Sequence, residues 1–155
     1  MKYLRKFNEA AVSQFFYNDY KFGLELQEFC NDYLAYLIDK GFSVTLRDGT
    51  LPRGAKSKII VISKERTHFL SPSNFTWEEV VDDFIPFYTM LKSKYELLPF
   101  VDGKRILTDK TILISDYSVN DRGADHLISD DDIVNLTDLP YTIVYIRLLV
   151  KHKNI

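Results

Sequence analysis

One stretch of the sequence, residues 74–95, constrains the fold more than any other. Thr76 is followed three residues later by Glu79, which is the spacing of a capping box at a helix start. Phe75 and Val80 flank that start as a hydrophobic staple. Apolar residues then recur at steps of three and four, which predicts a helix with one face on the core. They are Trp77, Val80, Val81, Phe84, Tyr88, Leu91 and Tyr95.

A proline, Pro86, interrupts this pattern near its middle. Proline removes one backbone donor and clashes with the preceding helical turn. The apolar period nevertheless resumes in phase after it. The sequence therefore predicts one kinked helix, which ends before Pro99.

A second amphipathic helix is predicted over residues 24–40, and Gly41 follows it as a C-cap glycine. Its apolar stripe consists of Leu26, Phe29, Cys30, Tyr33, Leu34, Leu37 and Ile38. Cys30 is the only cysteine of the chain, which excludes an internal disulfide framework. Because Cys30 lies on the stripe, we predict a buried structural cysteine and not a nucleophile.

Between the two helices the apolar pattern changes to that of strands. Residues 42–47 alternate between apolar and polar, and residues 58–64 contain a continuous apolar run. These two segments predict an antiparallel hairpin. Further strands are predicted at residues 104–107, 111–117 and 141–151.

The region between the last two predicted strands is read as a polar loop over residues 118–128 and a short helix. Ser129 and Asp132 open that helix, which is predicted to span Asp130 to Leu136. The order helix, strand, strand then occurs twice, which indicates an α+β fold. We expect a mixed or antiparallel sheet with both long helices on one face, the order αββαββ of a permuted ferredoxin-like sandwich.

Composition restricts both the organisation and the class of protein. Its 155 residues, 46% hydrophobic and 27% charged, suit one globular domain, predicted over residues 24–155 after an arm and aromatic segment at 1–23. The net charge of -2 argues against a protein that coats nucleic acid. The apolar runs are too short for a membrane helix, and the N-terminus is too polar for a secretory signal. We therefore expect an intracellular protein with no membrane partner.

The loop between the two hairpin strands is the most basic part of the chain. It looks like a phosphate loop, but Ala55 separates Gly54 from Lys56, where the motif has lysine directly after glycine. It also joins two strands, whereas a phosphate loop leads into a helix. What remains is the hypothesis of an anion or nucleic-acid contact, set against a solvated loop. Its residues are Arg47, Arg53, Lys56 and Lys58.

Clustered aspartates over residues 116–138 raise the hypothesis of a hard-cation site. The spacing of a calcium loop is absent, and three of these aspartates begin the short helix, where negative charge suits the helix dipole. The three histidines lack the paired spacing of a zinc site. They are His68, His126 and His152. We therefore predict no metal, no cofactor and no catalytic residues.

The aromatic segment over residues 10–23 is the best candidate for a surface that binds a protein partner, or alternatively for a cover over the open sheet face. The residues chosen for the partner surface are Tyr17, Tyr20 and Phe22.

Several runs resemble small proteins of tailed bacteriophages, notably of those that infect Bacteroidota. The runs are residues 1–9, Phe29 to Leu37, Phe75 to Glu79, Phe84 to Phe87, and Ile146 to Lys151. The resemblance implies no assigned activity. Together with a well-specified core and the lack of a catalytic constellation, it leads us to expect a phage accessory protein that binds another macromolecule, a host or virion protein, in the host cytoplasm during infection.

A second implication of the resemblance concerns delivery into the capsid. Phe7-Asn8-Glu9 before Ala10 is similar to a site cut by a head protease, although Phe7 stands where an aliphatic residue is usual. A virion protein with a cleaved N-terminal tag is therefore one alternative function, and a weak nucleic-acid binder through the basic loop is the other.

Overall fold

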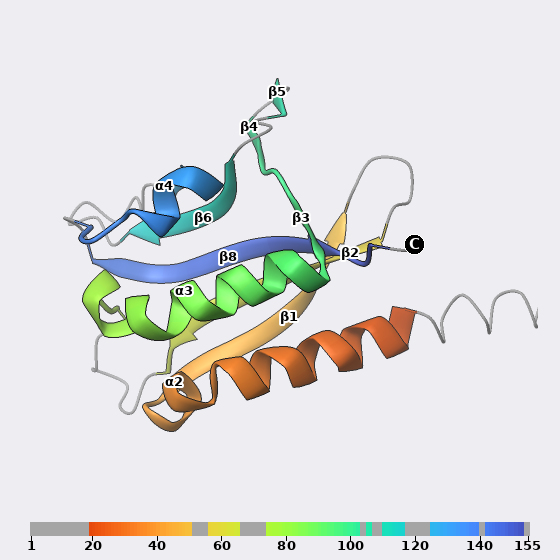
Figure 1. Ribbon diagram of the computed structural model, residues 1–155, viewed down its shortest axis with the longest axis horizontal. Coiled ribbons are helices and arrows are strands. Elements are labelled where there is room, and N and C mark those ends of the chain that lie inside the picture. The colour runs from red at the N-terminus through yellow and green to blue at the C-terminus, as the bar shows by residue number, and fades with distance from the viewer. Residues whose placement is uncertain are drawn as a thin grey trace, which may run out of the picture.

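The computed structural model describes residues 19–50, 56–65, 74–102, 105–106, 110–116, 125–139 and 142–153. They form an α+β fold in which helices pack on an antiparallel sheet (Figure 1). The predicted fold class is therefore confirmed, and the sheet is antiparallel throughout.

The described elements alternate between helices and strands along the chain. The helices are one over residues 19–33, then α2 (Ala35–Asp39), α3 (Trp77–Lys94) and α4 (Asp130–Val134). The strands of the large sheet are β1 (Phe42–Thr50), β2 (Lys56–Lys64), β3 (Glu96–Leu98), β6 (Lys110–Asp116), β7 (Asp125–Ser129) and β8 (Ile143–Lys151). A separate two-stranded hairpin consists of β4 (Val101–Asp102) and β5 (Arg105–Ile106).

The large sheet has the strand order β1-β2-β8-β6-β7, and β3 pairs with the last residues of β8. The order β1-β2-β8-β6, with a helix before β1 and another after β2, is the one that a permuted ferredoxin-like sandwich gives. β7 and α4 are inserted between β6 and β8. The last strand in the sequence therefore lies in the middle of the sheet.

The described helices lie on one face of this sheet, which we call the helix face (Figure 1). Alternate strand residues such as Val44, Ile60 and Ile146 point into the same apolar cluster as helix residues such as Leu26 and Phe84. Because side chains alternate along a strand, the residues between them point to the opposite face. We call that second face, which no described helix covers, the helix-free face.

Helix α3 begins as the sequence predicts. The Glu79 carboxylate accepts a hydrogen bond from the Thr76 backbone N–H at 2.7 Å. Phe75 exchanges two backbone hydrogen bonds with Ile143, of 2.8 and 2.7 Å, which fasten the helix start to β8. Trp77 is fully buried, and its indole N–H donates to the Leu136 carbonyl at 3.3 Å. This helix is thus the centre of the core.

Two predicted boundaries were wrong. The first helix was expected to begin after Gly23, but residues 19–23 are already helical and Phe22 is packed against Tyr95, with ring centroids 5.8 Å apart. A helical glycine costs about 1 kcal/mol relative to alanine, which burial of a phenylalanine outweighs. Residues 125–128, expected in a polar loop, belong to β7 because this segment pairs with β6.

Two other local predictions, the helix end at Gly41 and the hairpin of β1 and β2, are confirmed. Gly41 has a φ of 94°, and its N–H donates to the Ile38 carbonyl at 3.0 Å. It therefore ends the helix in the left-handed conformation that is typical of a C-cap glycine. The hairpin of β1 and β2 is antiparallel over its whole length. Within the described ranges, no helix is both long and apolar enough to cross a membrane.

Candidate functional site

The basic residues of the β1–β2 hairpin do not gather on one surface. Arg47 is exposed and points to the helix-free face, whereas Lys58, opposite Asp48, points to the helix face. Arg53 lies outside the described residues, as does the Lys56 side chain. The structure therefore places Arg47 and Lys58, the two predicted binding residues whose side chains it describes, on opposite sides of the sheet.

Lys58 is paired with two carboxylates of the protein itself. Its ammonium lies 2.5 Å from an Asp48 carboxylate oxygen and 3.4 Å from one of Asp19, and its side chain is largely buried. Burial alone would lower the pKa of Lys58, but the two carboxylates outweigh it and raise that pKa above its ordinary value. Lys58 therefore fastens the first helix to the hairpin.

The aromatic residues chosen as a partner surface have different environments. Tyr17 lies outside the described residues. Phe22 is only 3% exposed and contacts the rings of Tyr95 and His152, so its assignment to a surface was wrong. Its position on the helix turns it toward the core. Tyr20 is 66% exposed and remains a candidate for contact with a partner.

Three aspartates of the acidic region lie at the start of α4. Asp130–Asp132 form the first turn of α4, as predicted, and Ser129 caps it by accepting from the Asp132 N–H at 3.2 Å. Across the described parts of the chain, no three acidic, histidine or cysteine side chains are grouped as metal ligands.

A serine and a histidine lie close in sequence to aspartates on β6 and β7. The Ser115 hydroxyl donates to Asp125 at 2.5 Å, and the His126 Nε2 lies 2.8 Å from Asp116. However, His126 is opposite the core residue Ile114 and shares its face, while Ser115 and Asp125 are on the other face. The sheet therefore separates this serine from this histidine, and they do not form a nucleophile and its base.

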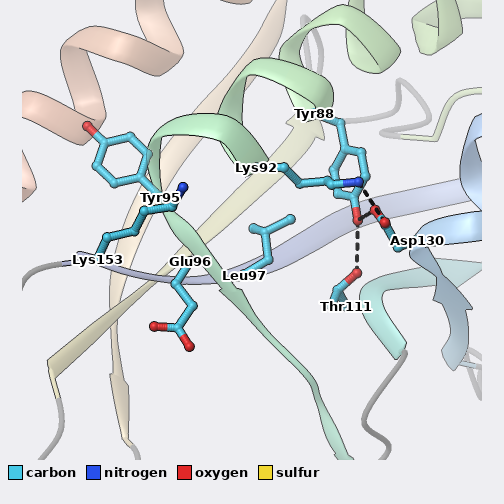
Figure 2. A pocket seen from close by; sticks show the side chains of 8 residues that line it. All are labelled: Tyr88, Lys92, Tyr95, Glu96, Leu97, Thr111, Asp130 and Lys153. Carbon is cyan, nitrogen blue, oxygen red and sulfur yellow. Dashed lines mark hydrogen bonds and ion pairs between the residues drawn. The ribbon is translucent and has the colours of Figure 1, made fainter.

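A pocket of about 430 Å³ lies at the C-terminal end of α3, beside β3. Figure 2 shows Leu97 in its middle, with Lys92 and Thr111 on one side and Lys153 on the other. Two lysines and two acids line it, so the pocket has no net charge that would favour an anion or a cation.

The polar groups on one side of this pocket bind one another (Figure 2). The Tyr88 hydroxyl donates to Asp130 at 2.6 Å and lies 3.0 Å from the Thr111 hydroxyl, and Lys92 donates to the other Asp130 oxygen at 2.6 Å. Burial first, and the Asp130 carboxylate second, raise the pKa of Tyr88 above its ordinary value. Tyr88 therefore keeps its proton at neutral pH, and the network joins α3 to β6 and α4.

Cys30 is fully buried, and burial raises the pKa of its thiol to about 12. The reactive form of cysteine is the thiolate. The predicted burial of Cys30 is therefore confirmed.

The outer edge of β1 is the feature with the clearest capacity for binding. Glu65 N–H donates to the Gly41 carbonyl at 2.8 Å, which fixes the residues that bond across the hairpin as the odd-numbered ones of β1. The backbone groups of the even-numbered residues consequently point outward. They belong to Phe42, Val44, Leu46, Asp48 and Thr50. None of the described strands pairs with that edge.

One flank of the first helix borders this edge. The Gln27 side-chain amide reaches the outward Val44 carbonyl at 3.4 Å. Leu24 and Tyr20 lie on that flank, about one and two turns of helix before Gln27, and are 53% and 66% exposed. We call the outward groups of β1 together with Tyr20 and Leu24 the β1 edge surface.

Sequence reasoning missed most of this surface and all of the pocket. Leu24 gave a usable signal, since it and Tyr20 are apolar residues four apart that fall outside the buried stripe. The pocket gave none, because Lys92, Thr111 and Asp130 come from three separate elements. The direction of the β1 backbone groups depends on strand register, which side-chain patterns do not specify.

Comparison with known proteins returned no match: no protein-family model, no curated protein and no solved structure is similar to this chain.

Proposed function

We propose that this is a binding protein without catalytic activity, and that its partner is another protein that docks on the β1 edge surface. The observation that carries the proposal is the row of outward backbone groups on β1 beside the exposed Tyr20 and Leu24. An unpaired strand edge and exposed apolar side chains both gain from contact with a polypeptide. An accessory role in phage infection, in the host cytoplasm or the virion, rests on the sequence resemblance alone.

The pairing of the reactive side chains supports the absence of catalysis. Lys58 is held by two carboxylates, and Asp130 by Lys92 and Tyr88. These ion pairs and hydrogen bonds hold elements of the fold together, so we assign these side chains a structural role.

The nucleic-acid alternative has less support. Of the basic residues predicted for it, Arg47 is exposed, but Lys58 is neutralised by Asp48 and Asp19. The capsid-delivery alternative depends on residues 1–9, which lie outside the described part of the chain.

Position-specific photocrosslinking tests the proposal. A photoreactive amino acid placed at Tyr20 should give discrete adducts with a protein in cells that contain the partner. The same amino acid at Val134, which is 54% exposed on α4, is the control and should give none. Adding Leu24→Glu should remove the Tyr20 adducts, because a charge would then lie within the contact. Equal adducts from both positions, or adducts that persist with Leu24→Glu, would contradict the proposal.

A further inference from the structure

We propose that the partner is held by strand addition, in which an extended segment of it pairs with β1 and continues the sheet. This inference rests on the proposed function and specifies its partner. The segment would carry apolar side chains at alternate positions and an acidic side chain between them.

The direction of the backbone groups selects an extended polypeptide. Val44 and Leu46 present their N–H and C=O groups outward, and of these four groups only the Val44 carbonyl has a partner among the described residues, the Gln27 side-chain amide. An extended peptide offers alternating donors and acceptors at the spacing these groups require. A helix satisfies its backbone groups internally, and a nucleic acid has no backbone N–H to donate.

The first helix determines which side chains of the added strand would be favoured. Asp19 contacts Lys58, the partner of Asp48, and Gln27 contacts Val44. Between these contacts the helix rises about 12 Å and the strand spans about 13 Å, so the two run side by side in opposite directions. Leu24 therefore lies level with the middle of β1.

An added strand would consequently meet two different surfaces. Its side chains on the helix face would lie beneath Tyr20 and Leu24, which favours apolar residues there. Its side chains on the other face would lie beside Arg47, which is exposed and which none of the described carboxylates pairs with. A carboxylate at the position next to Arg47 would be favoured by this charge.

A second copy of the chain fits the edge less well than a peptide. Contacts of Asp19 and Gln27 place the first helix over the β1 side of the sheet. Two copies paired through β1 would bring two such helices over neighbouring parts of one sheet, and their flanks with Tyr20 and Leu24 would have to share the space above the new strand pair. A peptide strand carries no helix and leaves that space to its own side chains.

Peptide binding to the full-length chain tests strand addition. The probes are ten-residue peptides selected for binding from a displayed random library and then synthesised. N-methylation of every second peptide amide removes the donors that would face β1, and should weaken binding roughly tenfold or more per position. N-methylation of the other amides should have little effect, because those groups face away from β1.

Amide exchange and two variants locate the bound peptide. Binding should slow hydrogen exchange of the outward amides of Val44 and Leu46. Leu24→Glu should weaken binding at least roughly tenfold, and Arg47→Glu should reverse the preference for an acidic residue. Val134→Glu, a charge added on α4 away from the edge, is the matched control and should leave binding unchanged.

Other outcomes overturn the inference in distinguishable ways. Failure to select any peptide, or binding that is insensitive to the position of N-methylation, rejects strand addition, while Tyr20 crosslinks would still support the proposed function. Protection of the Val44 and Leu46 amides without peptide, at all concentrations, means that a segment of the chain itself occupies the edge. Protection that appears only with rising protein concentration means that a second copy does.

Discussion

Two buried tyrosines, Tyr88 in α3 and Tyr95 directly after it, differ in the hydrogen bonding of their hydroxyl groups. Tyr88 and Tyr95 both belong to the predicted apolar stripe, and both are almost completely buried. The Tyr88 hydroxyl is bonded to Asp130 and Thr111. The Tyr95 hydroxyl, turned away from the pocket toward the first helix in Figure 2, has no hydrogen-bond partner among the described residues.

The same substitution should therefore have opposite effects at these two positions. Tyr88→Phe should lower the free energy of unfolding by about 1–3 kcal/mol, because it leaves buried partners unsatisfied. Tyr95→Phe should leave that free energy unchanged or raise it, because it removes a buried hydroxyl that pairs with nothing described. Urea unfolding of both variants and the wild type measures the difference. Equal destabilisation by the two substitutions would contradict this assignment.

Cys30 provides a second prediction for a single residue. Its thiol is fully buried and its pKa is raised to about 12, so the native protein should react with a thiol reagent only very slowly at neutral pH. Denaturant should expose the thiol and allow rapid labelling. The measurement is the labelling rate in the two states, and rapid labelling of the native protein would show that the core around Cys30 is open.

At the scale of elements, charged pairs connect segments that are distant in the sequence. Lys58 joins the first helix to the hairpin, and Asp130 joins α4 to Lys92 and Tyr88 on α3. Burial alone would raise the pKa of the Asp130 carboxyl, but the hydrogen bonds from Lys92 and Tyr88 outweigh it and hold that pKa below its usual value.

This pKa gives stability a defined dependence on pH. A carboxyl whose pKa is lower in the folded state stabilises the protein above its unfolded pKa, about 3.9 for aspartate, and that contribution is lost as the pH falls through the folded pKa. Asp130→Asn removes the charge while keeping an acceptor for Tyr88. The variant should be less stable than wild type at pH 7, and this gap should shrink toward pH 3. A gap of constant size from pH 7 to pH 3 would contradict the link.

At the scale of the whole molecule, patterns within one segment predicted the fold better than the site. The stripes that contain Trp77 and Leu26, and the alternation in β1, specify elements because each pattern is local. β7 escaped prediction because its strand structure depends on pairing with β6, and the break expected at Gly23 failed because burial of Phe22 continues the helix.

The candidate surface depends on interactions that no single segment encodes. Tyr20 was predicted as a contact residue. It belongs to the candidate surface because it lies beside the edge of β1, where the register of the hairpin directs the backbone groups of alternate residues outward. Lys58 was predicted as an anion contact, but Asp19, which is 39 residues away in the sequence, pairs with it. The charge of a residue in sequence therefore says little about the charge it presents to a partner.

Amide hydrogen exchange along β1 in the free, full-length protein is the most direct test of an open strand edge. Slow exchange is predicted for the amides that bond across the hairpin. They are those of Ser43, Thr45, Arg47 and Gly49. Fast exchange is predicted for the outward amides. They are those of Phe42, Val44 and Leu46. Equal protection of both sets would contradict the account, because it would mean that another segment already pairs with this edge.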